Sequence, residues 1–226
     1  MSENNEQQWF QFSLPTTPLL KCTLTDDIIT YLWKRIKVAR DENIDVKHQL
    51  AGNIEQSLQL TDENNYFFNN VLKDVCRQYV EENPKVPSFR NSISDLYISN
   101  LVLRELWMNS QLQNDFNPLH DHTGVISFVV WMKVPTSFKE QHEIQKCKNS
   151  ANPAASDFQI VYNDVTGAQR GYSIPMDPSI NGTMIVFPST MLHQVYPFYD
   201  CEDERVSISG NLYYNGTIGE KQNGLS

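Results

Sequence analysis

The first half of the chain spaces its apolar residues in the manner of amphipathic helices. In the segment TDDIITYLWKRIKVAR, which starts at Thr25, apolar side chains recur on one helical face, and Asp26 and Asp27 fall in the first turn. The segment TDENNYFFNNVLKDVCRQYVEEN, which starts at Thr61, repeats this arrangement. Threonine is a common helix N-cap. The pattern therefore predicts two helices that pack through their apolar stripes and are capped by Thr25 and Thr61.

The rest of the chain has a different pattern. The segment VKHQLAGNIEQSLQL (46–60) contains a Gly-Asn pair and predicts a loop or a short extended stretch. From residue 94 onwards, short runs rich in Val, Ile, Tyr and Phe are separated by Gly, Pro, Asn and Asp. These runs are SDLYISNLVLRELWMN, TGVISFVVWMKV, FQIVYND, GTMIVFPS, HQVYPFY and RVSISGNLYYN. Strand signals at such regular spacing favour a sandwich or a jelly-roll barrel.

Together the patterns predict an α+β fold in a single domain that spans residues 1–226. We expect residues 1–93 to form a mainly helical N-terminal layer and residues 94–215 to form the β-barrel core. The last residues, 216–226, read as a flexible tail. The polar stretch at 135–157 interrupts the strand pattern, so it predicts a surface loop or a lid.

Composition excludes several classes of protein. Lys and Arg number 18 against 27 for Asp and Glu, and the resulting net charge of −9 opposes binding to nucleic-acid backbones or anionic membranes. No window approaches the roughly 18 consecutive apolar residues of a membrane span, and the N-terminus has no secretory signal pattern. The four cysteines form no CxxC pair, which indicates reduced thiols and a cytoplasmic location.

Histidines cluster just before an apolar run in the stretch NPLHDHTGVISFVVWMKVP. On extended backbone, residues two apart point to the same face, so His120 and His122 should aim into one space and Asp121 away from it. A third histidine, His193, lies in another extended segment, FPSTMLHQVYPF. Three such ligands could occupy one face of a metal ion and leave its other positions open. The alternative is that these are turn histidines with no ligand role.

The segment ERVSISGN places an arginine in a strand that otherwise reads as barrel core. Arg205, Ser207 and Ser209 share one face of this strand. A guanidinium that points into a barrel is costly unless an anion meets it, and its fork matches a carboxylate in a bidentate manner. The alternative is an ion pair between Arg205 and one of the acidic residues at 202–204, on the rim of the barrel.

These features together resemble the Fe(II)/2-oxoglutarate-dependent oxygenase superfamily. The resemblance rests on HDH before an apolar strand, on FPS and LHQVYP around the third histidine, and on ERVSIS. It covers about residues 105–215, with a weaker echo in HQLAGNIEQSLQL, and it is strongest to small oxygenases of phages and marine bacteria. It implies a double-stranded β-helix (a jelly-roll or cupin-like barrel), Fe(II), 2-oxoglutarate as co-substrate and O2 as oxidant, in a hydroxylase of unknown substrate.

By this resemblance, His193 matches the distal iron ligand and His120 the first ligand of the usual HxD/E motif. The sequence departs from that motif because His122 stands where the acid should be. Three interpretations follow. All three histidines bind iron, which we favour from strand alternation; a bulge turns Asp121 inward instead; or residues 122–124 form an HxG site, as in related halogenases, where a halide fills the vacant position.

The resemblance also assigns the co-substrate end of the site. Arg205 matches the arginine that grips the remote carboxylate of 2-oxoglutarate, and Ser207 matches its hydroxyl partner. Asn211 is a further expected contact, with Asn109 and Trp131 as candidate cavity residues. The family reaction converts 2-oxoglutarate and O2 to succinate and CO2 while a C–H bond of the primary substrate is oxidised. That substrate is left open between a protein side chain and a small molecule.

Two other classes of function stay open from the sequence alone. A cupin-like three-histidine metal dioxygenase would keep the iron but would not use 2-oxoglutarate, so it would not need Arg205. A non-catalytic β-barrel binding module would need neither. The expected partners are 2-oxoglutarate and the unknown substrate, with no membrane and no preference for nucleic acid, and a homodimer is compatible with the sequence. The expected location is the cytoplasm, or the host cytoplasm if the protein is viral.

Overall fold

A computed structural model describes residues 19–83 and 101–215. The predicted tail at 216–226 and the first part of the strand run predicted from residue 94 lie outside the described residues. Within the described ranges, no helix is both long enough and apolar enough to cross a membrane.

Helices dominate the first part of the chain and strands the second, although β1 and β2 lie in the first part and α4 and η5 in the second. The strands are β1 (Leu20–Thr23), β2 (Gln56–Gln59), β3 (Leu101–Gln111), β4 (Asn117–His120), β5 (Ile126–Lys133), β6 (Phe158–Asn163), β7 (Gln169–Ile174), β8 (Thr183–Pro188), β9 (His193–Val195) and β10 (Arg205–Tyr214). The α-helices are α1 (Asp26–Glu42), α2 (Lys73–Glu82) and α4 (Phe138–Glu143). Shorter helical turns are η1 (Lys47–Gln49), η2 (Glu63–Asn65), η3 (Phe68–Leu72) and η5 (Pro178–Ile180).

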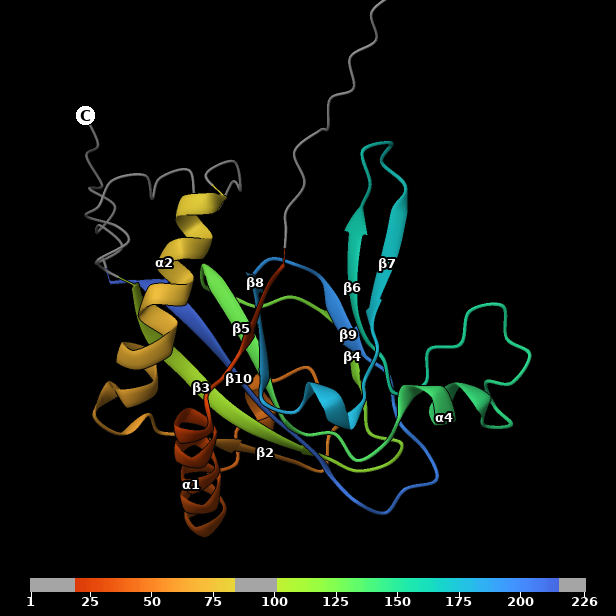
Figure 1. Ribbon diagram of the computed structural model, residues 1–226, viewed down its shortest axis with the longest axis horizontal. Coiled ribbons are helices and arrows are strands. Elements are labelled where there is room, and N and C mark those ends of the chain that lie inside the picture. The colour runs from red at the N-terminus through yellow and green to blue at the C-terminus, as the bar shows by residue number, and fades with distance from the viewer. Residues whose placement is uncertain (1–18, 84–100, 216–226) are drawn as a thin grey trace, which may run out of the picture.

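The strands form two antiparallel sheets. One has the order β1-β8-β5-β10-β3-β2 and the other the order β4-β9-β6-β7. Figure 1 shows the four-stranded sheet on one side of the six-stranded sheet and helices α1 and α2 on the other. Strands far apart in sequence therefore become neighbours, as when β10 lies between β3 and β5. This arrangement is the jelly-roll barrel with a helical layer that the strand pattern predicted.

Helix α1 confirms the first predicted helix. Its buried side chains include Ile28, Leu32 and Ile36, which recur at four-residue spacing and form the stripe that faces the sheet. Thr25 is the N-cap by backbone position, but its hydroxyl bonds to Asp27 and not to a backbone N–H. The helix ends where the next residue turns into the left-handed region and donates its N–H back to the last turn.

The second predicted helix exists, but its predicted cap is wrong. The carboxylate of Asp62, not the hydroxyl of Thr61, accepts the backbone N–H groups of Phe67 and Phe68, at 2.9 and 2.8 Å. A carboxylate can accept both bonds at once, and its charge is favoured at a helix N-terminus. The chain then passes through a π-helical turn, η3, before it continues as α2.

The N-terminal part of the chain also contributes two strands, of which β1 was not predicted. Strand β1 pairs with β8, and β2 pairs with β3, so each adds an edge to the six-stranded sheet. Strand β2 lies in the segment at 46–60, for which a loop or an extended stretch was expected. The polar stretch at 135–157 is mostly irregular and contains only the short helix α4. Edge strands this short form because they satisfy unpaired backbone groups of a longer neighbour.

The six-stranded sheet is buried on both faces. Toward the helices, Leu32 of α1 packs in one cluster with Met108 of β3 and Ile208 of β10, and all three are at most 1% exposed. Each such side chain stabilises the fold by about 1.5–3 kcal/mol. Toward the second sheet, Trp131 and Phe187 pack with Phe158 of β6. The second cluster ends at a polar cavity, where the candidate site lies.

Candidate metal centre and co-substrate cavity

Strand pairing brings the three predicted histidines together. His120 ends β4 directly opposite His193, which begins β9. His122 follows two residues later, and its backbone N–H donates to the carbonyl of Ser189, at 2.8 Å. The ring centroids are 4.2 Å apart for His120 and His193, and 4.8 Å apart for His122 and His193. One ring nitrogen from each histidine lies within 4.8 Å of the others, so this histidine cluster could hold a metal ion.

The hydrogen bonds of the imidazoles fix which nitrogen faces the centre. In His120 and His193, Nδ1 lies 2.7 and 2.9 Å from the carbonyl oxygen of the residue two positions earlier. In His122, Nδ1 lies 2.9 Å from the side-chain oxygen of Asn211. Because these oxygens only accept, each Nδ1 carries the proton and each Nε2 keeps a free lone pair. This is the tautomer that metal-binding histidines adopt.

The surroundings also keep the three rings neutral. Burial, followed by the neighbouring imidazoles, lowers the pKa of His193 to about 3. Burial is likewise the main cause that lowers the pKa of His120 and of His122. Proximity of three imidazolium charges would be strongly unfavourable, whereas three neutral rings offer three donors to a cation. The histidine cluster therefore fits Fe(II) in its donor type, its tautomers and its charge.

Asp121 does not join the cluster. It is exposed, although it lies on the wall of the same cavity, and His120 and His122 flank it on the inner face. Strand β4 ends at His120, directly before the aspartate. His120 and His122 converge with His193, whereas Asp121 is exposed and stays outside the cluster.

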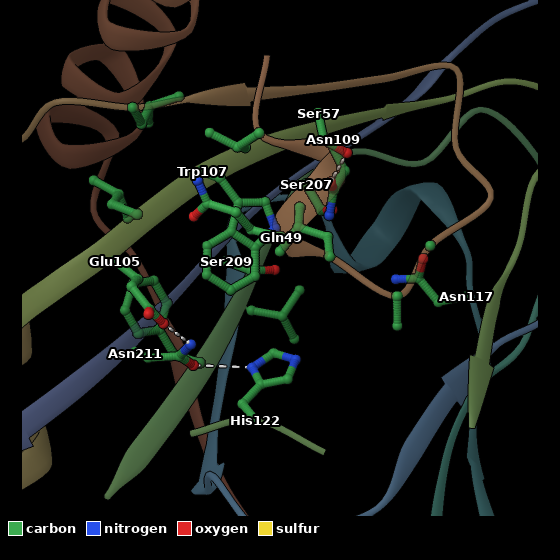
Figure 2. Close-up of a pocket in the computed structure, with 18 of the residues that line it drawn as sticks. Gln49, Ser57, Glu105, Trp107, Asn109, Asn117, His122, Ser207, Ser209 and Asn211 are labelled. Atoms are coloured by element: carbon green, nitrogen blue, oxygen red, sulfur yellow. Dashed lines mark hydrogen bonds between the residues drawn. The ribbon is translucent and has the colours of Figure 1, made fainter. Parts of the chain in front are cut away.

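A cavity of about 690 Å³ extends from the histidine cluster between the two sheets. One wall consists of paired residues on the inner face of β10 and β3, which alternate with core residues on the other face. These pairs are Arg205 and Gln111, Ser207 and Asn109, Ser209 and Trp107, and Asn211 and Glu105. Figure 2 shows most of this wall, with Asn117 set apart from it. The predicted residues Asn109, Trp131, Ser207 and Asn211 all line the cavity.

Arg205 is buried in this cavity, with 2% of its surface exposed. Its Nη2 donates to the hydroxyl of Ser156, at 2.6 Å, and Nη1 lies 3.5 Å from the side-chain oxygen of Gln111. The guanidinium carbon lies 4.9 Å from the ring centroid of Phe198. The Nε–H group is buried and has no partner. A buried donor without an acceptor is costly, so the group is suited to an incoming anion.

The rim ion pair that the sequence left open for Arg205 is not observed. Glu204 accepts from Arg40, at 2.7 and 2.8 Å, and from the hydroxyl of Ser110, and Asp203 pairs with Lys133, at 2.6 Å. Glu202 is exposed and forms no ion pair within the described ranges. Burial lowers the pKa of Arg205 to about 9, and only Asp157 opposes this effect. The guanidinium charge is thus poorly compensated until a carboxylate binds.

Several cavity residues were not predicted from the sequence. Glu105 and Gln111 belong to the inner face of β3, and two-residue alternation across that strand would have found them. Ser156 lies in a loop and adopts a left-handed backbone conformation (φ 72°), for which no sequence pattern gave a signal. His142, expected at the surface or in packing, bonds to Asp157, at 3.1 Å.

Comparison with known proteins agrees with this geometry. Residues 105–211 match a family described as "Putative 2OG-Fe(II) oxygenase", where 2OG is 2-oxoglutarate. This segment is a 2OG-Fe(II) oxygenase domain. It contains the three histidines, Arg205 and most of the two sheets. The protein is therefore an oxidoreductase that depends on Fe(II), 2-oxoglutarate and O2. No curated protein matches the chain in sequence.

Solved structures agree on the fold of this oxygenase. The non-heme alpha ketoglutarate dependent carbocyclase SnoK from nogalamycin biosynthesis aligns over 93% of this chain and 87% of its own, with a TM-score of 0.52 and 9% identity. EvdMO1 aligns over 88% of this chain and 48% of its own, with a TM-score of 0.51 and 12% identity. These likenesses confirm the double-stranded β-helix and do not extend to the reaction. A Pseudomonas putida prolyl-4-hydroxylase aligns over 89% and 95% of the two chains at 16% identity, but its TM-score of 0.45 supports no argument.

Proposed function

We propose that this oxygenase is a hydroxylase whose iron is held by His120, His122 and His193. The observation that carries this assignment is the tautomeric state of the histidine cluster. All three Nδ1 atoms lie within hydrogen-bonding distance of acceptor oxygens, and one ring nitrogen of each histidine lies within 4.8 Å of the others. Histidines with purely structural roles would have no reason to share this arrangement. Bound iron would supply the activation of O2, which no side chain of the cavity can perform.

The co-substrate would occupy the cavity between the histidine cluster and Arg205. The guanidinium, with its unpartnered Nε–H, would bind the remote carboxylate of 2-oxoglutarate, and Ser207 would add a hydroxyl from the same strand face. Ser156 holds the guanidinium from behind, at 2.6 Å, and so fixes its direction. Trp131 and Phe187 exclude water on the side of the second core cluster.

Succinate formation tests this proposal. We expect the wild-type protein, supplied with Fe(II), ascorbate and O2, to convert 2-oxoglutarate to succinate even without its primary substrate. Replacing Arg205 by Ala should reduce succinate formation by more than tenfold, because a charge-assisted bidentate contact contributes roughly 1.5–3 kcal/mol per bond. Arg40→Ala, which removes a surface arginine that pairs with Glu204, is the matched control and should retain the activity.

Fe(II) affinity shows whether each variant is folded, since the histidine cluster forms only when the two sheets are in place. An Arg205→Ala variant that binds Fe(II) and still produces succinate at the wild-type rate would contradict the role of Arg205. That result would favour a cupin-like three-histidine dioxygenase. Absence of Fe(II) binding by the wild type would instead favour a binding module without catalysis.

We further propose a protein side chain or a small molecule as the primary substrate. A net charge of −9 does not favour nucleic acid, and titration with labelled DNA and RNA would show this directly.

Four cysteines without a disulfide support a cytoplasmic location, which fractionation of expressing cells would test. A homodimer is the default for such a chain, and light scattering in solution would give its mass.

A further inference from the structure

Both the oxygen and the nitrogen of the Asn211 side-chain amide form hydrogen bonds within the protein. Its oxygen accepts from Nδ1 of His122, at 2.9 Å, and from the hydroxyl of Ser127, at 2.7 Å. Its amide nitrogen donates to a carboxylate oxygen of Glu105. The amide therefore joins the histidine cluster to Glu105, as Figure 2 shows. This leaves it little capacity to contact the co-substrate, which was the role expected from the sequence.

In each hydrogen bond to Glu105, the carboxylate is the acceptor. The hydroxyl of Tyr213 donates to the other carboxylate oxygen of Glu105, at 3.0 Å. The hydroxyl of Thr123 lies 2.7 Å from that of Tyr213 and can donate to its oxygen. From the other side, His122 donates to Asn211, which donates to Glu105. Both oxygens of Glu105 accept, which is the arrangement that suits an ionised carboxylate.

Strand register holds this network in place. Glu105 on β3 lies directly opposite Asn211 on β10, and Ser127 on β5 lies opposite Asn211 on its other side. Asn211 is 4% exposed and Ser127 is fully buried. Three neighbouring strands of one sheet thus fix the amide, so its oxygen cannot turn away from His122 without breaking bonds to all three partners.

A ligand set of three neutral histidines lacks the negative charge that the usual HxD/E motif brings to iron. From these contacts we propose that Glu105, acting through the amide of Asn211, supplies that missing charge from outside the ligand set and tunes iron binding at His122. Glu105 is thus a positioning and charge-balancing residue, not a ligand. An anion at the Nδ1 side of an imidazole strengthens donation by its Nε2 and favours the positive metal. The inference rests on the proposed function, because it assumes that the histidine cluster holds the iron.

Replacing Glu105 by Gln isolates the charge, because the amide can still accept from Asn211. We expect Fe(II) affinity, measured anaerobically by calorimetry, to fall about tenfold. The Fe(III)/Fe(II) potential of the loaded protein should rise, since loss of an anion destabilises Fe(III) more than Fe(II). A purely structural role would not move that potential. Glu204→Gln, at the other end of β10, is the matched control and should leave both quantities unchanged.

A second variant tests whether the effect passes through the amide. Asn211→Ala should weaken Fe(II) binding, and adding Glu105→Gln to it should cost little more, since the path is already broken. Equal Fe(II) affinity and potential in Glu105→Gln and the wild type would overturn the inference, as would fully additive effects in the double variant. If the wild type itself binds no Fe(II), the proposed function fails first, so the two failures are distinguishable.

Discussion

At the scale of single residues, the most informative position is His122, which stands where relatives with the usual motif carry an acid. Both histidines that flank Asp121 belong to the histidine cluster, and the aspartate is exposed. The three histidine side chains therefore need no reorientation to serve as ligands in the proposed iron site. The site compensates for the lost carboxylate at another position, through Glu105, and not by bending the strand.

Single substitutions separate the two candidate ligands. We expect His122→Ala to lose Fe(II) affinity by more than the roughly 10–100-fold that removal of an outer partner costs. Asp121→Ala should stay within about twofold of the wild type, because Asp121 is exposed and does not belong to the histidine cluster. Anaerobic calorimetry with Fe(II) measures both. Loss of binding in the Asp121 variant alone would show that a rearranged strand, not the one described, binds the metal.

The residues of the site differ in how far sequence could predict them. Spacing alone predicted the convergence of His120 and His122 and the shared face of Arg205 and Ser207, because strand alternation is a local rule. The same rule would have placed Glu105 on the cavity face of its strand, but not its role, which comes from lying opposite Asn211 on another strand. Pairing between strands roughly one hundred residues apart in sequence is not visible in a local pattern.

At the scale of elements, the start of the second helix shows where local rules compete. Thr61 and Asp62 are both good caps, and the sequence pattern favoured the threonine. The structure uses the aspartate, because its two oxygens accept from Phe67 and Phe68 while the hydroxyl of Tyr31 also reaches it, at 2.7 Å. The short strands β1 and β7 were missed for a related reason. They are set by the neighbours they pair with and carry little periodicity of their own.

This capping assignment has a direct test. Asp62→Ala should lower the free energy of unfolding by about 1–2 kcal/mol, at the upper end of the range for N-caps, because two backbone bonds are lost together. Thr61→Ala is the matched control and should change it by less than about 0.5 kcal/mol, since its side chain is exposed. Denaturant titration followed by circular dichroism gives both values. An equal loss in the two variants would mean that the threonine shares the capping role.

At the scale of the whole molecule, the helical layer and the barrel share one core. Leu32 and Ile36 of α1, together with Leu72 at the end of η3, belong to the same cluster as Met108 and Ile208 of the six-stranded sheet. We therefore propose that both parts form one domain. Removal of either part would expose the apolar face of the other.

Unfolding experiments test this proposal and the metal site together. We expect one cooperative transition in which helical circular dichroism and tryptophan fluorescence coincide. Fe(II) at about 100 times its dissociation constant should add about 2.7 kcal/mol of stability, and excess chelator should remove that gain. Loss of the helical circular dichroism signal before the change in tryptophan fluorescence would contradict the proposal of a single domain. A transition that Fe(II) does not shift would contradict a metal site that depends on the folded sheets.

Strand β10 sets the length scale of the proposed chemistry. It carries Arg205 at one end of the cavity and Asn211, the support of His122, six residues further on the same face. Inward positions on a strand recur every second residue, about 7 Å apart. Moving the arginine to another inward position of β10 would therefore shift its contact with the far carboxylate by about 7 Å or more. A diacid slightly longer or shorter than 2-oxoglutarate could be accommodated only by a side chain of different length at position 205.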